Sequence, residues 1–207
     1  YALRGNTYDE AKKRLLFLKD VIENKGGQRL FYVDGKPIER EADLLLWATW
    51  SGLRQDMSGM FISAAHKSSG KTTLTIGLCA ALTSRGIVVQ SFKKGPDYID
   101  PMWLAQASGR ACYNLDPYLM GWGEIQTLFD RHAEHADFSI VEGNKGLFDG
   151  LALDGSNSNA AVAAHLGLPV VLVIDARGMT RGIAPLILGY QAFDSGIRIA
   201  GVILNNL

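Results

Sequence analysis

The sequence predicts an α/β fold in which a parallel β-sheet is covered by helices on both faces. From residue 59 onward, short apolar runs alternate with helix-like segments, which is the order of parallel strands joined by helical crossovers. The apolar runs are nearly continuous stretches of Val, Ile and Leu, a pattern typical of strands that are buried on both faces. These two observations together favour a sheet with helices on each side.

The elements follow one another in a regular order. In sequence, we expect strand 61–65, helix 72–85, strand 87–92, a polar loop, helix 123–134, strand 138–143, helix 159–166, strand 169–176, helix 180–193 and strand 197–204. In open parallel sheets, ligands bind at the carboxyl ends of the strands. The polar loops after residues 64, 92, 142 and 175 are therefore expected to converge on one site.

Residues 1–56 have a different pattern and are treated as a separate small α+β module. They combine an amphipathic helical pattern over 8–23, a hairpin-like stretch over 29–38 and a second helical run over 41–50. Trp47 and Trp50 lie three residues apart in that second run and are interpreted as core or contact residues. No chemistry is assigned to this module, and residues 57–207 form the second predicted domain.

The composition excludes several classes of partner. Lysine plus arginine and aspartate plus glutamate number 21 each, so an extended surface for nucleic acid or anionic membrane is not expected. No apolar run has membrane-spanning length, and no secretory signal pattern is present at the start. Cys79 and Cys112 form no CxxC pattern, which argues against a zinc site or a disulfide framework. We expect a cytoplasmic protein, and a fragment of a longer chain, because the sequence stops directly after a strand-like run.

A polar loop with one glycine lies between the first strand and the first helix of the predicted sheet. The segment SSGKTT has the strand–loop–helix context of a phosphate-binding loop, although Ala65 stands where the GxxxxGK[ST] pattern has its first glycine. Backbone N–H groups would wrap the phosphates, Lys71 would reach the β- and γ-phosphates, and Thr72 would hold Mg²⁺. The predicted nucleotide site consists of Ala65, His66, Lys67, Ser68, Ser69, Gly70, Lys71, Thr72, Thr73 and Lys93.

The loop after the second strand places lysines beside carboxylates. In KKGPDYIDP, Lys93 and Lys94 precede Asp97 and Asp100, and two prolines stiffen the segment. Asp97 is predicted to act at Mg²⁺ or at the reacting group. Asp100 precedes Pro101, so a helix-capping role remains open for it beside a catalytic one.

A third loop follows the strand that ends in VEGNKGLFDG. Glu142 leaves a buried apolar run, and a carboxylate there is costly unless it is paired or bound to metal, which favours Mg²⁺ coordination. Lys145 and Asp149 lie on the same loop and are expected to face a second ligand, while a solvated loop with glycine turns is the alternative.

Five separated segments resemble the amidoligase domain of the cobyrinic acid a,c-diamide synthase family, in the family's order and spacing. They are FKKGPDYIDPMW, NLDPYLM, VEGNKGLFDG, PVVLVIDARGMTRG and AGVILN. The likeness covers about residues 60–207 and implies a dethiobiotin-synthetase-like P-loop fold. It also implies amidation of tetrapyrrole side-chain carboxylates with ATP, Mg²⁺ and ammonia released from glutamine, through an acyl phosphate.

The resemblance assigns roles to individual residues. Thr72, Asp97 and Glu142 would hold Mg²⁺, and Lys71, Asp97 and Asp100 would support formation and turnover of the acyl phosphate. Tyr98 and Asp149 would contact the substrate. The family's glutaminase domain, with its nucleophilic Cys and partner His, has no counterpart in this sequence, so ammonia is expected from a further domain or a partner. A homodimer remains open.

Two departures leave alternatives open. The loop reads AHKSSGKTT where the family usually has TGSGxGKTT, and NKG follows Glu142; both features are closer to the siroheme amidase branch. Cobyrinic acid and siroheme are therefore both expected as candidate substrates. The alternative of a different class is a dimeric P-loop switch similar to chromosome-partitioning ATPases, which carry Lys where this chain has His66. A third alternative makes residues 1–56 an interaction domain.

Overall fold

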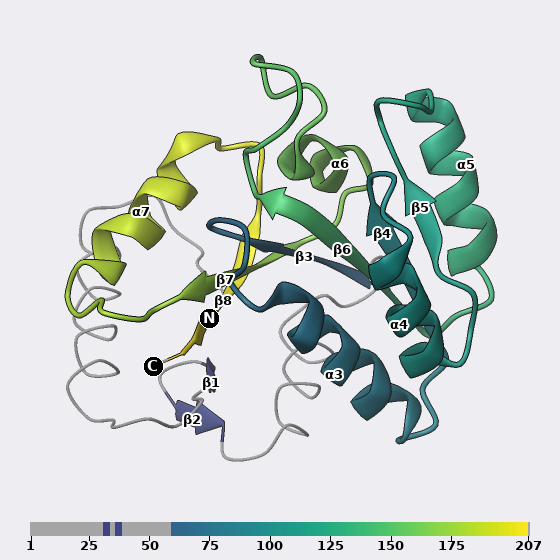
Figure 1. Cartoon of the computed structure of the whole chain (residues 1–207), viewed down its shortest axis with the longest axis horizontal. Coiled ribbons are helices and arrows are strands. Elements are labelled where there is room, and N and C mark those ends of the chain that lie inside the picture. Colours follow the sequence, from purple (N-terminus) through teal and green to yellow (C-terminus); the bar gives the residue numbers. More distant parts are fainter. Residues whose placement is uncertain (1–30, 34–35, 39–58, 207) are drawn as a thin grey trace.

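The computed structural model describes residues 31–33, 36–38 and 59–206, and its largest element is a six-stranded, all-parallel sheet (Figure 1). The spatial order is β5-β4-β6-β3-β7-β8. The strands are β3 (Gly59–Ala64), β4 (Val89–Lys94), β5 (Tyr113–Leu115), β6 (Phe138–Gly146), β7 (Val170–Asp175) and β8 (Ile199–Asn205). The predicted α/β class with a parallel sheet is confirmed.

Helices cover both faces of this sheet. They are α3 (Lys71–Thr83), α4 (Ile99–Ser108), α5 (Trp122–Ala133), α6 (Asn159–His165) and α7 (Ile183–Phe193). One apolar cluster joins alternate strand residues such as Met60 and Ile62 to α3 and α4. The other joins Phe61 and Leu172 to α5, α6 and α7. Consecutive strand residues thus enter different cores, as the uninterrupted apolar runs predicted.

Two elements depart from the sequence expectation, since the segment between β4 and α5 contains more than a polar loop. Helix α4 begins after Tyr98 and carries Pro101 in its first turn, where the missing N–H costs little. Strand β5 has three residues and pairs only with β4 at the sheet edge. A strand this short is below the length at which apolar periodicity is recognisable.

The hairpin predicted within residues 29–38 is confirmed in its strands. Strands β1 (Phe31–Val33) and β2 (Lys36–Ile38) pair antiparallel. The two helices expected at 8–23 and 41–50, with Trp47 and Trp50, lie outside the described residues. Within the described part of the chain, no helix has the length and apolarity needed to cross a membrane.

The register of the central strands fixes the place of the charged residues. Glu142 on β6 lies opposite Lys93 on β4 and opposite Ile62 on β3. Strand β6 continues past Glu142 through a register shift and pairs again where Gly146 lies opposite Ala64. The carboxyl ends of β3, β4 and β6 therefore bring the phosphate-binding loop, Lys93 and Glu142 to one edge of the sheet.

Candidate active site

The loop between β3 and α3 has the backbone conformation of a phosphate-binding loop. Gly70 adopts φ +88°, and Ser68 also has a positive φ of 64°. A Cβ atom on Gly70 would collide with the side chain of Asn205, so this position requires glycine for both conformation and space. Helix α3 begins at the next residue and points its free N–H groups into the loop.

Side chains from distant segments hold this loop in place. Asn205 Nδ2 donates to the carbonyl oxygen of Ser69 at 3.0 Å, and Ser69 Oγ donates to the carbonyl oxygen of His66 at 2.8 Å. The hydroxyl of Tyr190 donates to the carbonyl oxygen of Ala65. Beside the loop lies a pocket of about 260 Å³, lined by Ser68, Gly70, Thr73, Asn205, Asn206 and apolar residues of α3, β7 and β8. The loop is preorganised and has a cavity next to it.

Lys71 is buried at the start of α3 with its ammonium near other charged groups. Burial is the largest influence and lowers its pKa, and the charge of Lys93 acts in the same direction. Glu142 and Asp100 oppose this shift. A partly desolvated cation at the first turn of the helix is well placed to bind an anion.

Four side chains from four elements form a charged cluster beside the loop. Lys93 Nζ donates to Asp100 Oδ2 at 2.6 Å, to Glu142 Oε1 at 3.0 Å and to the carbonyl oxygen of Gly143 at 3.3 Å. Thr72 Oγ1 lies 2.7 Å from Glu142 Oε1 and 3.2 Å from Asp100 Oδ2. The cluster joins α3, β4, α4 and β6, which meet beside the loop in Figure 1.

The electrostatics of this cluster follow from burial and pairing. Burial raises the pKa of Glu142, whose side chain is 0% exposed, while Lys93 and Thr72 act against that shift. Burial alone would lower the pKa of Lys93, but Glu142 and Asp100 outweigh it and raise that pKa. For Asp100, burial is outweighed by the hydrogen bond and charge of Lys93, which lower its pKa. Lys93 is therefore held as a cation between two acidic groups.

The same cluster fits a hard divalent cation. Glu142 Oε2 is buried and has no hydrogen-bond partner within the described residues. An acceptor in this state, beside the oxygens of Thr72 and Asp100, matches the oxygen ligands that Mg²⁺ prefers. Among residues 59–206, no three His, Cys, Asp or Glu side chains form a metal site by themselves. Mg²⁺ bound here would need phosphate or water oxygens to complete its shell.

Asp97 has a different position from Asp100. Its Oδ1 accepts hydrogen bonds from the N–H groups of Ile99 at 2.9 Å and Asp100 at 3.2 Å, and its Oδ2 lies 3.9 Å from Lys93 Nζ. Asp97 thus supports the start of α4, whereas Asp100 contacts Thr72. The role of Asp97 at Mg²⁺ stays a prediction.

The two predicted substrate residues lie on different segments of the chain. Tyr98 is 76% exposed at the start of α4. Asp149 Oδ2 accepts the N–H of Gly146 at 3.1 Å and lines a pocket of about 370 Å³ together with Lys94 and Lys145. His66 and Lys67 are exposed on the phosphate-binding loop.

Three asparagines support the site, and no role was predicted for them from the sequence. Asn159 Nδ2 donates to the carbonyl oxygen of Gly146 at 2.8 Å, which fixes the loop after Glu142. Asn114 Nδ2 donates to the carbonyl oxygens of Gly95 and Asp97, which fixes the loop after β4. Asn205 binds the phosphate loop. The sequence signal was weak: Asn159 starts a helix, Asn205 ends a strand, and Asn114 lies in the middle of the short strand β5.

The fold and this site define a P-loop nucleotide-binding α/β protein. Solved structures with a similar fold include the kinase domain of Escherichia coli tyrosine kinase ETK, with a TM-score of 0.58, 17% identity and coverage of 90% of this chain and 84% of that one. Chloroplast FtsY from Physcomitrella patens gives a TM-score of 0.50 at 16% identity, over 95% of this chain and 58% of that one. Residues 122–207 also match a family model described as an AAA domain.

Curated relatives narrow the class. The chain is 55% identical over 148 residues to a cobyrinate a,c-diamide synthase of Magnetococcus marinus, which is 72% of this chain and 32% of that protein. It is 48% identical over 149 residues to a hydrogenobyrinate a,c-diamide synthase of Streptomyces coelicolor, which is 72% of this chain and 31% of the relative. The chain belongs to the cobyrinic acid a,c-diamide synthase family. It spans about a third of the length of the curated relatives that it matches.

Proposed function

We propose that this chain supplies the ATP-dependent step of an enzyme that amidates side-chain carboxylates of a tetrapyrrole of the cobyrinic acid type. The main support is the cluster of Thr72, Lys93, Asp100 and Glu142 beside the phosphate-binding loop. It combines an unpartnered buried carboxylate oxygen with a fixed cation, next to a lysine that can reach a phosphate. The names of the relatives support the tetrapyrrole substrate.

The nucleotide would occupy the phosphate-binding loop, with its phosphates at the N–H groups of the loop and at Lys71. The pocket of about 260 Å³ that ends at Asn205 and Asn206 is suited to the nucleoside. Thr72 and Glu142, with Asp100 or Asp97, would hold Mg²⁺, which neutralises phosphate charge when bound.

The reaction would proceed in two transfers. A substrate carboxylate oxygen attacks the γ-phosphorus, the bond to ADP breaks, and an acyl phosphate forms. Ammonia then attacks the carbonyl carbon, the bond from carbon to the phosphate oxygen breaks, and the nitrogen loses a proton as the amide forms. Asp97 and Asp100 flank this region and are the candidates to accept that proton.

Two lysines near the phosphate-binding loop would allow a substrate carboxylate to approach the phosphates of ATP, although both groups are anions. Two unit negative charges about 4 Å apart repel by about 4 kcal/mol at an effective dielectric constant of about 20. Lys71, at the start of α3, and Lys93, within the cluster, would offset this repulsion and stabilise charge on the transferred phosphoryl group.

The names of the relatives favour cobyrinic or hydrogenobyrinic acid over siroheme as the substrate. Two features of the predicted enzyme remain part of this proposal: ammonia derived from glutamine at a further domain or partner, and a cytoplasmic location. Neither a homodimer nor a role for residues 1–56 is needed for the two transfers above.

Phosphate release with Mg²⁺, ATP and ammonium chloride tests the function directly. Cobyrinic acid, hydrogenobyrinic acid and siroheme are compared, and product masses are recorded at the same time. The expected result is phosphate release that depends on cobyrinic or hydrogenobyrinic acid, with a mass decrease of about one unit for each carboxyl converted. ATP turnover that ignores all three tetrapyrroles, without any mass change, would contradict the proposal and favour a P-loop switch.

A further inference from the structure

Lys94 is a buried lysine that the phosphate site does not use. It follows Lys93 at the end of β4 and, by strand alternation, projects from the opposite face of the sheet. Its side chain is only 5% exposed, and it forms no hydrogen bond or ion pair with the residues that the structure describes. Its nitrogen is not among the described polar atoms that are fully buried without a partner, so the ammonium group reaches the adjoining pocket, and its three donors remain available to a ligand.

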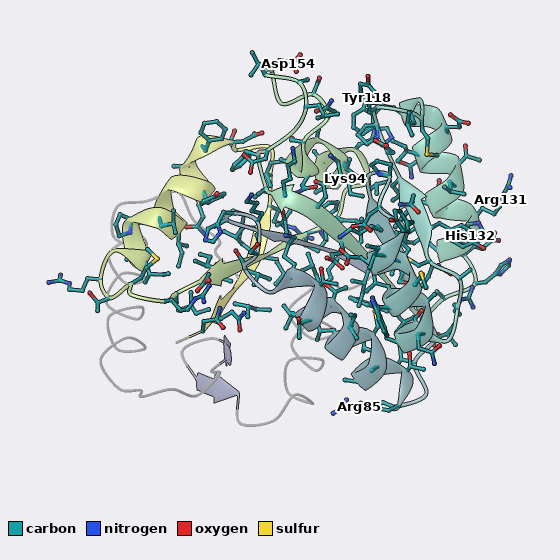
Figure 2. The ribbon with its side chains drawn as sticks, viewed as in Figure 1. Arg85, Lys94, Tyr118, Arg131, His132 and Asp154 are labelled. Carbon is teal, nitrogen blue, oxygen red and sulfur yellow. The ribbon has the colours of Figure 1, made fainter. Side chains whose placement is uncertain are left out.

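Lys94, which Figure 2 labels, is one of the residues that line the pocket of about 370 Å³. The outer part of the pocket is apolar, because Tyr118, Leu119 and Leu151 are 69%, 70% and 68% exposed. Lys145 adds a second positive charge on the loop after β6. An apolar rim around a buried cation suits a large apolar ligand that carries an acidic group.

Two carboxylates also line this pocket, but both bind backbone. Asp116 Oδ1 accepts the N–H of Tyr118 at 3.0 Å, and Asp149 Oδ2 accepts the N–H of Gly146 at 3.1 Å. The charge of Asp116 partly opposes the effect of burial on the pKa of Lys94, without a contact short enough to form an ion pair. The acids shape the walls, and the ammonium group is left for the ligand.

We propose that Lys94 binds a second, non-reacting carboxylate of the tetrapyrrole and so determines which carboxylate of that substrate is amidated. This inference rests on the proposed function, and it adds a specificity-determining residue to it. Lys93 and Lys94 are consecutive and project to opposite faces of one strand end. A ligand with several carboxylates on one framework can place one carboxylate beside the phosphate-binding loop and another at Lys94. A ligand with a single carboxylate can occupy only one of these two places.

The test compares Lys94→Met and Lys94→Gln with the wild-type chain, using cobyrinic acid, ATP, Mg²⁺ and ammonium chloride. Arg131→Met is the matched control, because it removes one positive charge from α5 at a site that projects away from the pocket (Figure 2). We expect the KM for cobyrinic acid to rise about tenfold in both Lys94 variants, since a charge-assisted hydrogen bond is lost. The KM for ATP and the melting temperature should stay near wild type. Fragmentation masses of the product should show more amide at carboxylates that the wild-type chain leaves unreacted.

Several results would overturn the inference. A KM for cobyrinic acid within twofold of wild type, with an unchanged pattern of amides, would show that Lys94 does not bind the substrate. A parallel rise in the KM for ATP and a lower melting temperature in both variants would indicate a structural role instead. If the wild-type chain forms no amide at all, the proposed function fails; equal equilibrium affinity of wild type and Lys94→Met for cobyrinic acid would then separately reject the role of Lys94.

Discussion

Lys93 and Lys94 stand side by side at the end of β4, are 2% and 5% exposed, and have opposite surroundings. Lys93 binds two carboxylates and a carbonyl oxygen, and its pKa is raised. The side chain of Lys94 has no hydrogen bond or ion pair within the described residues, and burial lowers its pKa. Equal burial therefore says little about the role of a lysine. The acceptors around it distinguish a cation that is part of the structure from one that is available to a ligand.

The largest expected effect is on the rate of amidation, and it distinguishes residues of the phosphate-binding loop from residues that line the Lys94 pocket. Lys71→Met should lower ATP-dependent amidation about 10³-fold, or about 4 kcal/mol in activation free energy, for every tetrapyrrole substrate. The reason is that Lys71 would stabilise the transferred phosphoryl group whichever carboxylate reacts. Steady-state rates with two tetrapyrroles check this. A loss confined to one substrate would mean that Lys71 acts on substrate choice, as proposed for Lys94.

The second effect compares the two lysines in stability. Lys93→Met leaves Glu142 and Asp100 without their cation, and we expect a loss of about 3 kcal/mol in the free energy of unfolding at pH 7. Lys94→Met removes a charge that has no ion-pair partner within the described residues, so its change in the free energy of unfolding should stay within about 1 kcal/mol. Urea unfolding of both variants measures the difference. Equal destabilisation would contradict the distinction between a paired and an unpaired lysine.

The third effect compares two glycines with nearly the same φ: Gly70 at +88° in the phosphate-binding loop, and Gly95 at +89° in the lining of the Lys94 pocket. Gly70→Ala should cost about 2 kcal/mol and raise the KM for ATP, because the new methyl group meets an Asn205 side chain that is fixed to Ser69. Gly95→Ala should lower the free energy of unfolding by about 1 kcal/mol. The new methyl group would lie 3.0 Å from Asn144 Nδ2, and this side chain can move aside because it is partly exposed. Melting curves measure the loss of stability in both variants, and ATP titrations measure the affinity for ATP. A similar loss of ATP affinity in Gly95→Ala would contradict this comparison.

The smallest effect is a difference in pH dependence. The lowered pKa of Lys94 means that the unfolded chain holds its proton to higher pH, so this residue adds stability as pH rises through its folded pKa toward 10.5. Lys93 behaves in the opposite way, since its raised pKa gives stability that is present below 10.5 and is lost as pH rises through the folded pKa. Melting temperatures between pH 8 and pH 10.5 should rise in wild type relative to Lys94→Met. A difference in melting temperature between wild type and Lys94→Met that stays constant from pH 8 to pH 10.5 would contradict a lowered pKa for Lys94.

Much of the fold and part of the site were predictable because their signals are local. The apolar runs of β3, β6 and β7, the GKTT segment and the carboxylate at the end of a buried strand each lie within a few residues. The contact of Glu142 with Thr72 is 70 residues long in sequence, yet the parallel sheet rule led to the same edge.

The parts that were missed depend on long-range pairing or on short elements. Helix α4 and strand β5 are short, and neither shows a clear apolar periodicity in the sequence. Asn159 and Asn205 bind partners 96 and 136 residues away, and an isolated Asn carries no mark of such a partner. The division of roles between Asp97 and Asp100 depended on the exact start of α4, which sequence patterns locate only to within a few residues.

The hydrogen bond from Asn205 to Ser69 joins the last strand of the sheet to its first loop. Contacts between such distant segments form after the chain between them has been ordered, because closing a long loop carries an entropic cost. The phosphate-binding loop can therefore reach its final shape only when β8 has paired with β7. Nucleotide affinity during refolding should accordingly appear together with the pairing of β8 and β7.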